Sequence, residues 1–334
     1  MSLISAPLLA VGQESLRQVV VPVEQSSREI ARDAASPSEQ IPAGVLVIAA
    51  LPESSEAAGD AGRAASEPGL PDPPTSAPSD RVRAVQDAAG NRFSLASHKA
   101  SYVLPAAYYA GEGDAEGTSG VSADLKPIEI EFQLSVQVPV WTGLLGPSSF
   151  LSAAYTNHSF WQAYTPSAPF RESIHEPEVL LTWLSDWELL GFECAATQLA
   201  FSHQSNGLEG EQSRGWNRIY AHFIFERDQY FLAFKPWYRI PEDGVGDDNP
   251  DLGFYLGHFE FSGGFRGDRF GASMMLRNNL RSDNRGALEL RWSFPVGQRL
   301  RGVVRYFNGY GHGLLSYDRR QQSLGMGIEL AEGF

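Results

Sequence analysis

Three residues that could carry out ester hydrolysis lie in the segment "FSHQSNGLEGEQSRGWNRIY", residues 201–220. His203 and Ser205 are two positions apart, and Asn217 follows fourteen residues after the histidine. A serine hydroxyl becomes a nucleophile when an imidazole accepts its proton, and a third group on the other imidazole nitrogen fixes the ring. These residue types predict acyl transfer with Ser205 as nucleophile, His203 as base and Asn217 as the residue that orients the histidine.

The alternation of the neighbouring residues predicts where these side chains point. His203 and Ser205 continue the apolar face of a predicted strand, with Leu199 and Phe201. After the loop "GLEGEQ", Asn217 begins the apolar face of the next strand, which contains Ile219, Ala221, Phe223 and Phe225. Polar groups on such a face are costly, which favours a functional explanation. Cross-strand neighbours lie about 5 Å apart, so we expect Asn217 to reach His203.

The chain after residue 90 consists of short alternating segments separated by turn residues. The clearest is 286–294, "GALELRWSF", with apolar and polar residues on opposite faces. Similar segments lie at 93–105, 128–140, 148–158, 176–187, 191–206, 213–225, 230–240, 252–262, 265–278, 299–306 and 324–330. They amount to about twelve strands, an even number of the kind that closed antiparallel barrels use.

Two architectures bury one face of each strand. A soluble sandwich or lipocalin-like barrel turns the apolar face inward, whereas an outer-membrane barrel turns it toward lipid. Three features favour the membrane barrel: a charged polar face, Trp and Tyr near segment ends as in "KPWYRI", and the terminal aromatic residue Phe334. We therefore expect an all-β fold, a twelve-stranded antiparallel transmembrane β-barrel spanning 91–334.

Residues 1–90 have a different composition. They are rich in Ala, Ser, Pro and Glu, with twelve acidic residues, six arginines and no aromatic residue. Such a segment buries too little apolar area to offset its ordering entropy, so we expect a disordered extension. Its start, "MSLISAPLLAVGQES", is apolar but lacks the basic residues of a signal peptide, which leaves the export segment and mature start open. The net charge of −14 argues against a nucleic-acid partner.

"HQSNG" followed by "SRGWNR" resembles the active-site region of the bacterial outer membrane phospholipase A family. Other segments resemble the family in the same order, among them "PFRESIHEPEVLL", "KPWYRI…DDNPD" and "YFNGYGHGLLSYDRRQQSLGMGIEL". The resemblance covers about 92–334. It implies a calcium-dependent phospholipase A in the bacterial outer membrane that is active as a homodimer and releases fatty acid and lysophospholipid. His203, Ser205 and Asn217 match its triad.

The resemblance also implies the other site residues. Calcium ligands would be the Ser213 hydroxyl, the main-chain carbonyl of Leu208 and that of Ser167 of the partner subunit. The amides of Ser205 and Gly207 would form the oxyanion hole. A second calcium position of the family matches Asp248, but its other carboxylate position is Gly210 here, so this second site is doubtful. Asn157 matches a polar position in the family's dimer interface.

Two alternatives remain at this stage. A non-catalytic outer-membrane barrel, such as a small porin or structural barrel, would explain the strand pattern, although twelve strands leave little lumen. A soluble lipid-binding barrel would place the same residues in its interior. The sequence does not indicate the acyl position, the head group or the trigger for dimerisation.

Overall fold

The computed structural model describes residues 95–111, 125–185, 187–242 and 246–330. All of them belong to the second of two units into which the chain divides, Leu70–Phe334. The extension expected over 1–90 and the terminal Phe334 lie outside the described residues. Within the described part, no helix is long and apolar enough to cross a bilayer.

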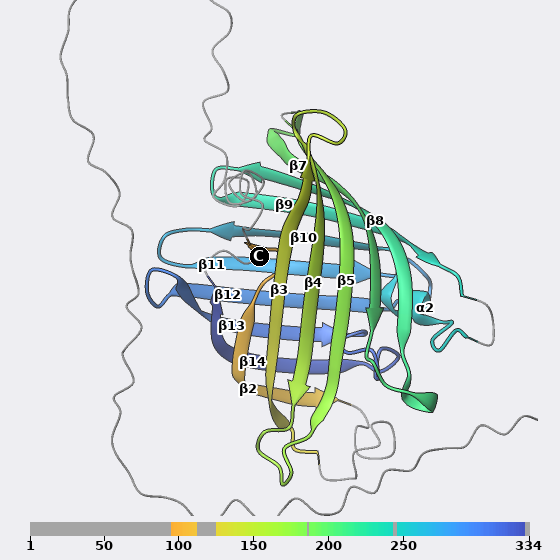
Figure 1. Ribbon diagram of the computed structural model, residues 1–334. Helices are drawn as coiled ribbons and strands as arrows, with labels where there is room; N and C mark the ends of the chain where they lie inside the picture. Colours follow the sequence, from red (N-terminus) through yellow and green to blue (C-terminus); the bar gives the residue numbers. More distant parts are fainter. Residues whose placement is uncertain (1–94, 112–124, 186, 243–245, 331–334) are drawn as a thin grey trace, which may run out of the picture. The chain divides into compact units, whose positions relative to one another are not determined.

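Twelve long strands form a closed antiparallel ring in the described part of the chain (Figure 1). They are β2 (Tyr102–Gly111), β3 (Ile128–Thr142), β4 (Ser149–Trp161), β5 (Phe170–Leu184), β7 (Phe192–Ser205), β8 (Gly215–Arg227), β9 (Tyr230–Ile240), β10 (Phe259–Arg266), β11 (Gly271–Asn278), β12 (Gly286–Pro295), β13 (Leu300–Gly309) and β14 (Gln321–Leu330). Each pairs with the next, and β14 pairs with β2, which closes the ring. The predicted twelve-stranded barrel is confirmed.

Four short elements of the described residues accompany the ring. The strand β1 (Ala96–Ser97) pairs with β3, and β6 (Glu188–Leu189) pairs with β7. A single 3₁₀ turn, η1 (Gly210–Gln212), lies in the loop between β7 and β8, and the helix α2 (Leu252–Leu256) lies between β9 and β10. In Figure 1, β3, β4 and β5 cross in front of β10 to β13.

The barrel has an apolar exterior and a polar interior. Large apolar side chains are exposed along the ring, including Leu134, Val179, Leu199, Phe201, Ile219, Phe234, Met274, Leu290, Trp292, Leu324 and Met326. Charged side chains are buried, including Glu129, Glu131, Glu176, Glu178, Arg218 and Arg305. A soluble barrel would show the reverse distribution, whereas a lipid-facing wall requires this one. The soluble alternative is therefore excluded.

Opposite charges are paired inside the barrel. Arg305 contacts Glu131 and lies 2.7 Å from Glu289, and Arg171 lies 2.9 Å from Glu129. Taking a charge out of water is costly unless a partner and hydrogen bonds compensate for its lost hydration. These contacts provide that compensation and tie strands together across the interior.

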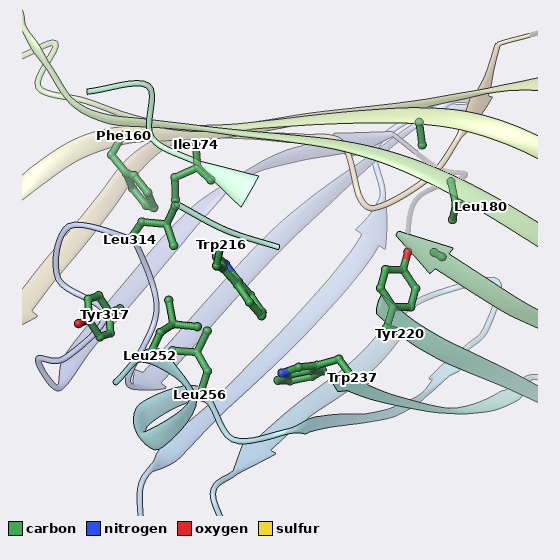
Figure 2. Packing of buried hydrophobic residues seen from close by; sticks show 12 residues of the cluster. Phe160, Ile174, Leu180, Trp216, Tyr220, Trp237, Leu252, Leu256, Leu314 and Tyr317 are labelled. Atoms are coloured by element: carbon green, nitrogen blue, oxygen red, sulfur yellow. The ribbon is translucent and has the colours of Figure 1, made fainter. Parts of the chain in front are cut away.

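Apolar residues gather where one end of the ring meets its connecting segments (Figure 2). Leu252 and Leu256 of α2 and Leu314, from the segment between β13 and β14, pack in one cluster with Phe160 and Trp216. The strand register places these connections at the same end as the β7–β8 loop, because Asn217 near the start of β8 pairs with Ile240 at the end of β9. This end of the barrel is therefore packed beneath the predicted site.

The structure corrects one predicted strand. Residues 252–262 were expected to be extended throughout, but they form α2 followed by β10, which begins at Phe259. Leu252 and Leu256 are four residues apart and both buried, as one helical turn allows. Over five residues, apolar positions at 252, 254 and 256 fit a strand and a helical turn equally well. Other boundaries also shift: β2 runs from Tyr102 to Gly111, β5 begins at Phe170, and β11 begins at Gly271.

Candidate active site

The register of β7 and β8 brings His203 and Asn217 together. The two residues are direct cross-strand partners. The His203 Nδ1 and Asn217 Oδ1 atoms lie 2.9 Å apart, which is hydrogen-bond distance. On its other side, Asn217 Nδ2 donates to Glu242 Oε1 at 2.8 Å. The asparagine therefore connects the imidazole to a carboxylate that lies just beyond the end of β9.

Ser205 lies on the same face of β7 as His203, two residues further on, and pairs with Gly215. A Cβ atom at position 215 would lie 3.5 Å from the Ser205 Cβ atom and 4.0 Å from the His203 Cε1 atom. Both side chains thus lie against the same point on β8, where the glycine leaves space. The two side chains are therefore neighbours on the outer face of β7.

The three side chains lie on the outer wall of the barrel. His203, Ser205 and Asn217 are all half-buried. Their apolar neighbours on the same faces, Phe201 and Ile219, are each 44% exposed. The residues that alternate with them point inward, and Trp216 is only 1% exposed. The site residues therefore face the direction expected from the sequence, in phase with the apolar wall.

Glu176 of β5 supports β7 and β8 from the barrel interior. Its carboxylate accepts hydrogen bonds from the Ser202 hydroxyl at 2.9 Å, from Gln204 Nε2 at 3.3 Å and from Arg218 Nη2 at 2.7 Å. These donors are the sequence neighbours of His203, Ser205 and Asn217, and they point to the opposite face. A buried, paired carboxylate thus holds the backbone that positions the outward-facing site.

Asn206 holds the loop between β7 and β8. Its Nδ2 donates to the Gln212 carbonyl at 2.9 Å, and its Oδ1 accepts from the amides of Leu208 at 3.2 Å and Arg214 at 3.0 Å. Gly207 and Gly210 have φ angles of +65° and +64°, which glycine adopts without steric cost. The buried Asn206 side chain therefore connects the two ends of the loop that contains Gly207, Leu208 and Ser213.

We predict that Asn206→Ala loosens this loop and leaves the barrel folded. Three hydrogen bonds are lost, and each buried bond contributes about 1 kcal/mol. Amide hydrogen exchange over residues 207–214 should accelerate by about 10-fold or more, since 1.4 kcal/mol corresponds to a factor of ten. Exchange in β8 should not change. The exposed Asn284→Ala is the matched control, and equal exchange rates in both variants would contradict the prediction.

The segment Asp247–Asp251 braces the same loop. Asp248 Oδ2 accepts a hydrogen bond from the Ser213 hydroxyl at 2.5 Å, and Asn249 Oδ1 accepts one from the Gly215 amide at 3.1 Å. Asp251 accepts from the Tyr317 hydroxyl. Burial, together with the Asp251 carboxylate, raises the pKa of Tyr317 above its ordinary value, so the hydroxyl remains a donor. The brace connects the site to the segment between β13 and β14.

The family model described as "Phospholipase A1" matches residues 79–330 of this chain. The chain belongs to the phospholipase A1 family. It is 32% identical to the Phospholipase A1 of Salmonella typhimurium over 246 residues, which cover 73% of this chain and 84% of that protein. It is also 32% identical to the Phospholipase A1 of Escherichia coli K12 over 250 residues, with the same coverage of 73% and 84%.

Solved structures of this family share the fold. The Salmonella typhi outer membrane phospholipase, described as a dimer with bound calcium, matches with a TM-score of 0.70 and 30% identity over 76% of this chain and 99% of that one. The outer membrane phospholipase A of Escherichia coli matches with a TM-score of 0.66 and 29% identity over 72% and 100%. The family match and the barrel fold together confirm the prediction that this chain is an enzyme of the bacterial outer membrane.

Asp248 lies beside Ser213 and accepts the hydrogen bond of its hydroxyl. Within the described ranges, no group of three or more His, Cys, Asp or Glu side chains is placed to hold a metal ion. The oxygen atoms that do gather here are the Ser213 hydroxyl and the Asp248 carboxylate, beside the loop that carries the Leu208 carbonyl. Ser167 lies in the turn between β4 and β5, with a φ angle of +65°.

A polar row continues from Ser205 across the outer wall. His175 of β5 pairs with Ser205 on one side and with Asn157 of β4 on the other. The Tyr155 hydroxyl lies 2.6 Å from His175 Nδ1. Sequence reasoning identified Asn157 but missed His175 and Glu242. His175 is in phase with exposed Val179, so a search for polar residues on the apolar faces could have found it.

Proposed function

We propose that this chain is a phospholipase A that hydrolyses acyl esters of phospholipids in the bacterial outer membrane, with His203, Ser205 and Asn217 as its catalytic triad. The observation that carries the proposal is the 2.9 Å contact between His203 Nδ1 and Asn217 Oδ1 on the apolar outer wall, with Ser205 on the same face. A non-catalytic porin or structural barrel has no need for this arrangement on its lipid-facing side.

The chemistry follows from the residue types. The Ser205 Oγ atom attacks the ester carbonyl while His203 Nε2 accepts its proton. His203 then returns this proton to the leaving oxygen as the C–O bond of the ester breaks, and the alcohol that leaves is a lysophospholipid. The amides of Ser205 and Gly207 are the donors toward the developing oxyanion. The neutral His203 next takes a proton from water, whose oxygen attacks the acyl-enzyme. The bond between the acyl group and Ser205 Oγ breaks, His203 returns the proton to Oγ, and the fatty acid is released. Asn217 keeps the ring plane fixed during both steps.

The residues around Ser213 suit a calcium ion. Calcium prefers oxygen ligands and tolerates irregular geometry, and the Asp248 carboxylate adds a negative charge beside the Ser213 hydroxyl. We propose that these two side chains and the Leu208 carbonyl hold Ca²⁺, with Ser167 of the partner subunit as a further carbonyl ligand. When bound, the ion would supply positive charge toward the ester oxygen. Asp248 thus supports the Ser213 site, and we propose no second site.

A homodimer would complete such a site, because one ligand comes from the other copy. A solved relative is described as a dimer with bound calcium. In this chain, Asn157 lies on the outer wall, where an amide gains a partner when two copies meet in lipid. The row of Asn157, His175 and Ser205 places this position two strands from the nucleophile. We propose that the dimer forms along β4 and β5.

Asn157→Ala is expected to weaken this dimer. Interhelical hydrogen bonds in membranes contribute about 0.6–1.7 kcal/mol, which corresponds to about a 3- to 20-fold weaker association if strands behave similarly. Sedimentation equilibrium in detergent with calcium measures the change. Asn308→Ala is the control, since Asn308 is on β13 and in phase with exposed Leu290 across the β12–β13 ladder. Equal dissociation constants for the two variants would place the interface elsewhere.

The experiment that tests the proposed function uses the detergent-solubilised full chain. Mixed micelles of detergent and phosphatidylcholine, with calcium present, should yield free fatty acid and lysophosphatidylcholine in equal amounts. Chromatography of the lipid products measures both. If correctly folded protein releases neither product, the phospholipase proposal is wrong.

A further inference from the structure

Glu242 contacts the residue that orients the catalytic histidine. Asn217 pairs with Ile240 at the end of β9, and Glu242 is two residues further along the chain. The Asn217 Nδ2 atom donates to Glu242 Oε1 at 2.8 Å, and Glu242 is half-buried. We propose that Glu242 is a positioning residue that determines the tautomer of His203 through Asn217. This inference rests on the proposed function, because it assigns the base of that reaction.

The hydrogen-bond chemistry of the three groups has one consistent arrangement. An ionised carboxylate only accepts hydrogen bonds, so the Asn217 amide nitrogen must face Glu242. The Asn217 oxygen then faces His203, so the proton of the imidazole must be on Nδ1. The Nε2 lone pair is left for the Ser205 proton. A chain of three groups thus sets the protonation state that catalysis requires.

Without Glu242 the Asn217 amide has two nearly equivalent orientations. In the flipped one, the amide nitrogen would donate to His203 Nδ1, and the ring would carry its proton on Nε2. That tautomer has no lone pair toward Ser205 and is inactive as a base. The carboxylate also places a negative charge behind a neutral amide, which favours the imidazolium that forms when Ser205 loses its proton. With Glu242 behind it, Asn217 thereby provides part of the electrostatic stabilisation that an aspartate would give to the imidazolium.

Single substitutions give the first test in the full-length enzyme. Glu242→Ala should lower kcat by about 10-fold, the range typical of outer residues that orient a ligating or catalytic histidine, and should leave KM unchanged. In an Asn217→Ala background the same substitution should cause no further loss, because Glu242 acts only through the amide. Glu188→Ala, at an exposed position on β6, is the control and should keep full activity.

The effect of Glu242→Gln on activity should have opposite signs in two backgrounds, and this reversal distinguishes a positioning role from structural support alone. Asn217→Asp places a second carboxylate against Glu242, which repels it. Adding Glu242→Gln supplies an N–H donor to the new carboxylate, so the double variant should be more active than Asn217→Asp alone. In the native background Glu242→Gln should instead lower kcat. A merely structural glutamate would change both backgrounds in the same direction, and that result would overturn the inference.

The tautomer can be measured without turnover. In a Ser205→Ala background, ¹⁵N chemical shifts of the His203 ring should indicate the Nδ1–H form, and Glu242→Ala should shift the population toward Nε2–H. An unchanged ratio would refute the role of Glu242. The two failures are separable: an inactive native enzyme rejects the proposed function, whereas an active one with unchanged tautomers and no sign reversal rejects only the role of Glu242.

Discussion

Ser205→Ala is expected to reduce fatty-acid release from phosphatidylcholine by at least about a thousandfold. Removing the nucleophile of a serine triad leaves only the contribution of substrate binding and the oxyanion donors, and measured losses reach about 10⁶-fold. The methyl group fits where the hydroxyl was, beside Gly215, so the barrel should fold unchanged. Initial rates with radiolabelled lipid give the required sensitivity.

Ser282→Ala is the matched control for this variant, because Ser282 is exposed in the loop between β11 and β12. It should retain native rates. The migration of unheated samples on a denaturing gel reports whether each barrel is folded. Hydrolysis that persists in correctly folded Ser205→Ala would eliminate the serine mechanism, although the family assignment would stand.

Chelation of calcium is expected to reduce the turnover rate by about 100-fold or more without unfolding the protein. The ring is closed by hydrogen bonds between β14 and β2, and ion pairs such as Arg305–Glu289 stabilise its interior, so we expect the barrel to stay folded without the ion. Added Ca²⁺ should restore the rate. Equal Mg²⁺ should not, because Mg²⁺ demands near-ideal octahedral geometry and gives up water reluctantly.

The variant Ser213→Ala tests whether calcium acts at this loop, independently of any general effect of the chelator. It removes a side-chain oxygen but leaves the Leu208 carbonyl and Asp248, so half-maximal activity should require about 10-fold more calcium. The maximal rate at saturating calcium should stay near the native one. Full activity in chelator, or an unchanged calcium requirement for Ser213→Ala, would show that this loop does not bind the ion.

Local alternation was sufficient to predict the wall of the barrel. A two-residue period assigns each side chain to one of two faces, and the strand over 286–294 was found as β12 with only its last residue added. The same rule placed His203, Ser205 and Asn217 on one side. What alternation cannot decide is which side faces lipid. The charge of the opposite face decided this question. Charged residues such as Glu176 and Arg218 lie on that face, and charged side chains do not face lipid.

The alternation of apolar and polar residues could not predict contacts between loops. Ser213 and Asp248 are 35 residues apart, and Asn217 and Glu242 are 25 residues apart. Their meeting depends on the register of β8 with β9 and on the path of the segments that follow, and no periodic signal encodes either. The helix α2 was missed because five residues are too few to distinguish two periods.

For the Ser205 nucleophile that we propose, the outward direction of the side chain determines which concentration governs the rate. A substrate that reaches the hydroxyl from the side diffuses in two dimensions, so its supply depends on the mole fraction of lipid in the surrounding film and not on moles per litre of solution. Diluting a micelle with inert detergent should then act as a competitive inhibitor does. Kinetic constants for this protein have physical meaning when expressed per unit of surface.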